Sequence, residues 1–124
     1  MGYYSEVAYV LAFENDEKRD AFREVVRLRK DELSKALAEC AVSTKEPWLQ
    51  FHDSSTKWYR EFPDVQAHRD LMQLCIECGG AYRFLRVGEE VDDVEDICDE
   101  SLRYQNQNIT PHGARQWCQG YSRN

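Results

Sequence analysis

Cys75 and Cys78 are separated by two residues, the spacing used by zinc sites and by redox dithiols. A redox dithiol stands at the start of a helix, whereas this pair falls near the end of a predicted one, where the helix dipole raises the pKa of a thiol. A structural zinc site needs further ligands, and the other candidates are scattered singly along the chain: His52, Cys98, His112 and Cys118. We therefore predict core cysteines and no metal, with a metal-stabilised module as an alternative.

Acidic residues are concentrated between positions 89 and 100, where eight of the twelve are Asp or Glu. An EF-hand calcium loop needs oxygen ligands at alternate positions, and Val91 and Val94 break that pattern. A hydrated magnesium site and a solvated helix face are alternatives, but we interpret the run as a docking surface for Lys and Arg side chains of a partner. The predicted contacts are six acids and two aromatic anchors: Glu89, Glu90, Asp92, Asp93, Glu95, Asp96, Trp58 and Tyr59.

Cations and aromatic rings occur together in two other stretches, 57–60 and 82–86. A surface of this kind can stack bases or hold an acidic ligand. Ordinary sheet packing with outward arginines produces the same pattern. Lys57, Arg83 and Arg86 are therefore the ligand-binding residues of an alternative function, that of a small nucleotide- or anion-binding domain or a small enzyme.

Catalytic groups are not indicated by the sequence. A nucleophile needs a neighbouring base, and His52, His68 and His112 stand in no recognisable triad context. Gly79 and Gly80 follow a predicted helix instead of preceding one, so they do not form a phosphate loop. We predict no catalytic residue and no cofactor.

The stretch 6–13 is predicted to be the strand around which the fold is built. Apolar residues fall on both of its faces, which is typical of a strand in the middle of a sheet. Two further strands are predicted at 48–52 and 81–87. A turn is predicted at 53–55, and whether 56–59 continues the second strand stays open.

Helical periodicity predicts two main helices, over 17–41 and 64–78. The first has an apolar stripe that is broken at Arg29 and Lys30, which predicts one long helix that is bent or partly exposed in its middle. The second begins at a proline and ends at a glycine pair, as helices commonly do.

The segment 89–100 repeats its apolar residues at spacings of three and four, so we expect a short acidic helix there. Residues 102–124 are rich in Gln, Asn, Gly and Arg, which predicts an irregular tail packed on or extending the core domain 1–101. Together these elements indicate an α+β fold, a small mixed or antiparallel sheet with the two main helices on one face. Right-handed crossovers would bring this fold close to a ferredoxin-like sandwich.

The chain has 124 residues, the size of one domain, and a net charge of −7, which argues against direct nucleic-acid binding. No apolar run is long enough to span a bilayer, and no secretion signal is recognisable, so we expect no membrane partner. Five cysteines are an odd number, which favours reduced thiols in the cytosol.

Three stretches occur in a familiar order: MGYYSEV at 1–7, KWY followed by FPDV at 57–65, and YRFLRVGE followed by DDVE at 82–95. This set resembles a family of small bacteriophage and prophage proteins, mostly without assigned function, and covers roughly residues 1–97. The chain departs from the family at 53–56, where DSST replaces an acidic pair and a hydrophobic residue. The resemblance implies an accessory protein that binds a host protein, including components of defence systems such as CRISPR complexes.

We therefore expect a phage-type, non-enzymatic interaction protein, a monomer or homodimer in the bacterial host cytosol. Its expected partner is a host protein with a basic surface, such as a nucleic-acid-binding defence complex, which it would inhibit. An acidic surface suits this role because it can occupy a groove that otherwise binds nucleic acid.

Overall fold

The computed structural model describes residues 2–100, so the predicted tail 102–124 lies outside the described residues. They form one antiparallel sheet and three helices, which confirms the α+β class. In chain order the elements are β1 (Ser5–Ala12), α1 (Asp16–Arg29), α2 (Glu32–Ala38), β2 (Ala41–Val42), β3 (Trp48–Thr56), α3 (Pro63–Glu77), β4 (Ala81–Val87) and β5 (Val94–Glu100).

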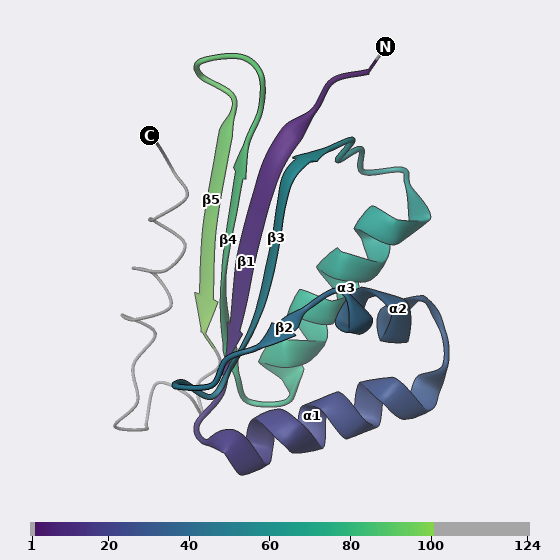
Figure 1. Ribbon diagram of the computed structural model, residues 1–124, viewed down its shortest axis with the longest axis vertical. Coiled ribbons are helices and arrows are strands. Elements are labelled where there is room, and N and C mark those ends of the chain that lie inside the picture. Colours follow the sequence, from purple (N-terminus) through teal and green to yellow (C-terminus); the bar gives the residue numbers. More distant parts are fainter. Residues whose placement is uncertain (1, 101–124) are drawn as a thin grey trace.

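β1 is the central strand, as its two-sided apolar pattern predicts. The strand order is β2-β3-β1-β4-β5, and all neighbours are antiparallel. All three helices cover the same face of the sheet (Figure 1). The expectation of a ferredoxin-like sandwich is not met, because a fifth strand lies outside β4 and β2 has only two residues.

The face that the helices cover is here called the proximal face, and the opposite one the distal face. β1 contributes Val7, Tyr9 and Leu11 to the proximal face, where all three are fully buried. Val26 of α1 and Leu71 of α3 belong to the same apolar cluster. Burying one such side chain contributes about 1.5–3 kcal/mol, so this layer is the main source of stability.

The prediction of one long helix over 17–41 is wrong, because the chain turns at Lys30. α1 ends where Lys30 adopts the left-handed conformation, with a φ of 54°. Asp31 then begins α2, since its side chain accepts a hydrogen bond of 3.0 Å from the amide of Leu33. The gap in the apolar stripe is therefore a turn between two helices that both contribute to the core.

The second predicted helix agrees with α3 to within one residue at each end, and the strand predicted at 81–87 has the bounds of β4. β3 continues through Thr56, so the predicted turn at 53–55 is part of a single strand. A shift of register between Ser5 and Val7 of β1 accommodates it.

The acidic helix predicted over 89–100 is wrong, because this segment is a turn followed by β5. β5 pairs with β4, where two arginines meet its acids. Arg83 binds Asp96, and Arg86 binds Glu95, with nitrogen–oxygen distances of 2.7 Å in both pairs. Cross-strand ion pairs stabilise a strand, and no pattern within the segment itself could show them.

Candidate functional site

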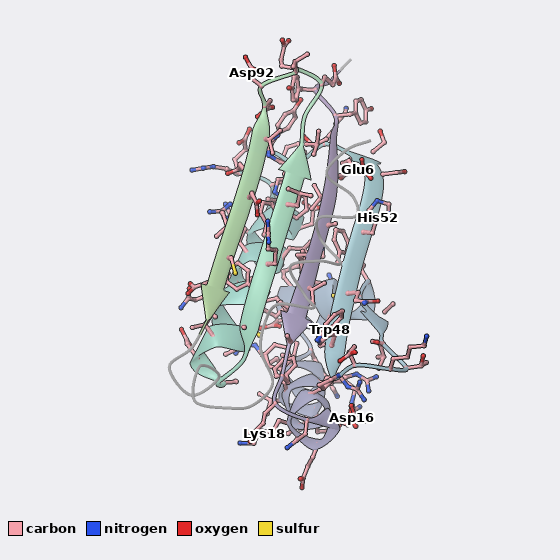
Figure 2. All side chains as sticks on the ribbon, turned by 90° about the vertical axis from the view of Figure 1, so that its left-hand side faces the viewer. Glu6, Asp16, Lys18, Trp48, His52 and Asp92 are labelled. Atoms are coloured by element: carbon pink, nitrogen blue, oxygen red, sulfur yellow. The ribbon has the colours of Figure 1, made fainter. Side chains whose placement is uncertain are left out.

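The turn between β4 and β5 has a defined shape. The amide of Gly88 donates to the carbonyl oxygen of Asp93 at 2.8 Å, which closes the turn. A side chain at Gly88 would collide with the carboxylate of Asp93 and the hydroxyl of Tyr3, so a larger residue would displace both groups. Figure 2 shows Asp92 in this turn, at the opposite end of the molecule from Asp16 at the start of α1.

Arg86 fixes the turn by binding two of its carboxylates. Its guanidinium donates to Asp93 at 2.6 Å and to Glu95 at 2.7 Å, and it also reaches the hydroxyl of Ser5 at 3.1 Å. The Arg86 side chain is only 14% exposed. Hydrogen bonds from Arg86 and from the hydroxyl of Tyr3 lower the pKa of Asp93 to about 2. These charges hold the hairpin together and are not free for a partner.

The segment that precedes β1 supports the same turn. The hydroxyl of Tyr3 donates to Asp93 at 2.7 Å and accepts from the amide of Glu90 at 2.9 Å. The amide of the next residue, Tyr4, donates to the carboxylate of Glu89 at 2.7 Å. The turn is therefore held from two sides, by a strand residue and by the N-terminal segment.

Three of the six predicted partner-binding acids are neutralised by arginines: Asp93, Glu95 and Asp96. Within residues 2–100, Glu90 and Asp92 form no ion pair, and both are exposed. Between them lies Val91, which is 94% exposed. We call the end of the turn the acidic tip, made of Glu89, Glu90, Val91 and Asp92.

The predicted aromatic anchors are not part of the acidic tip. Trp58 is half-buried, and its ring packs against three core rings: Phe51, His68 and Phe84. Tyr59 is also half-buried, and its hydroxyl accepts a hydrogen bond of 2.7 Å from the amide of Tyr3. The exposed apolar group of the tip is instead Val91, which sequence reasoning missed because a lone valine in an acidic run carries no distinctive pattern.

The alternative anion site is not brought together. Arg83 and Arg86 lie on opposite faces of β4 and bind different carboxylates. The ammonium group of Lys57 lies over the ring of Tyr4, 5.7 Å from its centroid. The three predicted ligand-binding residues therefore do not form one positive site.

A cleft of about 450 Å³ brings Arg86 together with two cations that were not predicted. Its arginines are Arg60, Arg69 and Arg86. Its carboxylates are equal in number: Glu61, Asp93 and Glu95. Because the charges balance, the cleft has no excess of positive charge with which to bind an anion.

A chain of hydrogen bonds runs from the core to the surface and joins three residues that lie far apart in the sequence. The hydroxyl of Tyr9 lies 2.6 Å from Nδ1 of His68, and Nε2 of His68 lies 2.9 Å from Glu39. Burial raises the pKa of Tyr9 and lowers that of His68. Burial also raises the pKa of the Cys40 thiol, 3.6 Å from the Tyr9 hydroxyl, to about 11. A catalytic nucleophile needs a lowered pKa and access to substrate, whereas burial raises the pKa values of Tyr9 and Cys40. We therefore interpret these hydrogen bonds as contacts that stabilise the core.

The cysteine pair is part of the structure of α3 and of the turn that follows it. Cys75 is fully buried, and burial raises the pKa of its thiol, while Cys78 is half-buried. Cys98, one of the scattered candidate ligands, is exposed on β5. Across the described part of the chain, no three His, Cys, Asp or Glu side chains are grouped so that they could hold a metal ion.

No helix within residues 2–100 has the length and apolar character needed to cross a membrane. Comparison of the chain with protein-family models, with curated proteins and with solved structures finds no match.

Proposed function

We propose that the protein is a non-enzymatic binding protein that attaches through its acidic tip to a basic surface of another protein and inhibits it. The division of charges in the hairpin supports this proposal most. Asp93 and Glu95 are used to fix the turn, whereas Glu90 and Asp92 remain exposed on either side of Val91. A loop that is already held in one shape loses less conformational entropy when it binds.

The acidic tip offers two kinds of contact. Its carboxylates accelerate the encounter with a basic surface and accept hydrogen bonds from Lys or Arg side chains. Val91 adds an apolar group that a partner can remove from water, which is how small contacts gain binding energy. The net charge of −7 attracts the same class of partner at longer range.

The resemblance to bacteriophage proteins suggests which partner to test first. A bacterial host protein whose basic groove binds nucleic acid, such as a CRISPR-type defence complex, presents the complementary charge. Carboxylates that occupy such a groove exclude the phosphates of the nucleic acid, and this exclusion is the proposed mechanism of inhibition. The binding takes place in the cytosol of the host.

Capture of partners from bacterial lysate tests the proposal. The wild-type protein is expected to retain a stoichiometric partner at low salt and to release it at high salt, because screening weakens exposed charge pairs. The variant Glu90→Lys/Asp92→Lys is expected to lose the partner. The matched control Asp70→Lys/Glu77→Lys makes the same change of charge at exposed positions of α3 and is expected to keep it.

Circular dichroism of both variants checks that the fold is retained. Equal capture by the two variants would remove the acidic tip from the proposal, since net charge alone would then explain retention. A partner that binds equally well at both salt concentrations would also contradict it. Inhibition is measured as loss of nucleic-acid binding by the captured partner when the wild-type protein is added.

A further inference from the structure

The centre of the distal face of the sheet is buried, although no helix of residues 2–100 lies over it (Figure 1). Val10, Ala12 and Ala81 are each 0% exposed, and Leu85 is 3% exposed. Ala12 lies opposite Ala81, and Ala8 lies opposite Leu85, so these side chains form one continuous patch on β1 and β4. We call these five residues the distal patch, and Figure 2 looks onto the face that contains it.

The distal patch cannot shield itself from water. Three of its five side chains are single methyl groups of alanine, which cannot cover their larger neighbours. Arg83, which lies opposite Val10 on the same face and binds Asp96 of β5, is only 8% exposed. A further layer must therefore cover this face.

The chain leaves the sheet next to this patch. β5 ends at Glu100, which lies opposite Ala81, and Ala81 in turn lies opposite Ala12. The sequence continues for 24 residues beyond Glu100. An extended chain advances about 3.3 Å per residue, so fewer than half of these residues would run the length of the eight-residue strand β1.

The composition of residues 101–124 suits the patch better than a second copy of the chain does. Three of its large apolar side chains can contact alanine, valine and leucine: Leu102, Ile109 and Trp117. The segment contains three arginines and no acidic residue, so it carries +3 against −10 for residues 1–100. Two whole chains of net charge −7 repel each other, whereas the segment is attracted to its own domain.

We propose that residues 101–124 pack against the distal patch and form the second cover of the sheet. The sheet then lies between the helices on its proximal face and this segment on its distal face, as a central strand that is apolar on both sides requires. The small side chains of Ala8, Ala12 and Ala81 leave room for a close approach. This inference does not depend on the proposed function, because the acidic tip lies outside the patch.

Nuclear magnetic resonance of the full-length protein tests the contact directly. Nuclear Overhauser effects are expected between the methyl protons of Ala8, Val10 and Leu85 and protons of residues 101–124. A mixture of isotope-labelled and unlabelled protein separates contacts within one chain from contacts between two copies. Contacts found only between copies would overturn the proposal in favour of a dimer, and so would the absence of any contact from the segment to these methyl groups.

A full-length variant gives a second test. Leu102→Ser/Ile109→Ser/Trp117→Ser is expected to make the amides of β1 exchange hydrogen about tenfold faster and to create a binding site for a hydrophobic dye. The control Val25→Ser/Leu28→Ser removes apolar side chains that are 52% and 61% exposed on α1, and it is expected to change neither property. Equal effects of the two variants, or no effect of the first, would overturn the proposal.

Discussion

The hydroxyl of Tyr9 lies 2.6 Å from Nδ1 of His68, and this contact joins the central strand to α3 inside the core. The rings of Phe51 and Trp58 lie beside the imidazole, with centroids 4.4 Å and 5.5 Å from it. The hydroxyl of Tyr9 and Nδ1 of His68 are both shielded from water. Burial of either atom is tolerated because the other one forms a hydrogen bond with it. The pair therefore constrains how α3 sits on the sheet.

Tyr9→Phe is expected to lower the free energy of unfolding by about 1–3 kcal/mol, because Nδ1 of His68 then loses its partner in a dry environment. Chemical denaturation measures the change. The control Tyr4→Phe removes the hydroxyl of an exposed ring and is expected to change stability by less than about 0.5 kcal/mol. Equal stability of both variants would show that the buried hydrogen bond contributes nothing.

Stability is expected to fall when the pH drops below about 6.5, and His68 is one cause. Burial lowers the pKa of His68 in the folded protein, against the opposing effect of Glu39, so the unfolded chain takes up a proton at a higher pH than the folded one. The contribution of His68 to stability is complete above its pKa in the unfolded chain. It is lost as the pH falls through its lower pKa in the folded protein. Urea midpoints measured from about pH 8 to about pH 5 report the slope. The variant His68→Gln is expected to have a smaller slope of stability against pH. An unchanged slope would show that other groups cause the loss of stability.

A second loss of stability is expected in more acidic solution, from the pair formed by Asp93 and Arg86. The pKa of Asp93 is about 2 in the folded protein, below its ordinary value of 3.8. Its contribution is present above the ordinary value and is lost as pH falls through about 2. Thermal unfolding in this window is expected to depend less on pH for Asp93→Asn than for the wild type. Asp92→Asn, which removes a carboxylate without an ion pair in the described part of the chain, should follow the wild type.

Lys30→Gly is expected to stabilise the protein by about 0.5–1 kcal/mol, because Lys30 has a φ of 54° and glycine adopts this conformation without strain. Chemical denaturation again provides the measurement. Arg29→Gly, one residue earlier at the end of α1, is expected to destabilise by about 1 kcal/mol because glycine weakens a regular helix. Destabilisation of similar size by both substitutions would show that the turn has no preference for glycine.

Val91→Ser is expected to leave stability unchanged, because the side chain is 94% exposed. The affinity of this variant for a partner that binds the acidic tip is expected to fall about tenfold, which is the loss typical of a desolvated apolar contact. Titration calorimetry with the captured partner measures this change. An affinity equal to that of the wild type would leave the carboxylates as the main contacts.

Much of the fold was predictable because local patterns coincide with burial. The two-sided apolar pattern identified β1, and the bounds of β4 and α3 followed from alternation and helical spacing. The segment 89–100 was not predictable in this way, because its apolar residues fit a helical period. The strand forms there because Arg83 and Arg86 of the preceding strand attract its acids.

The candidate site was predictable only in outline. Its acidic composition is visible in the chain, but which carboxylates are exposed depends on tertiary contacts. Asp93 and Glu90 both contact the hydroxyl of Tyr3, at the other end of the described chain, and no local pattern connects these residues. The half-buried position of Trp58 was not predictable for the same reason, since its ring packs on core residues that are distant in sequence.

The hydrogen bond between Tyr3 and Asp93 spans 90 residues, and this separation affects when the acidic tip can form. A nascent chain that leaves the ribosome presents Tyr3 long before Asp93 has been synthesised. Contacts between such distant residues form late, after the strands between them have paired. A partner that recognises the tip would therefore bind chains whose sheet has formed and not chains whose strands are still unpaired.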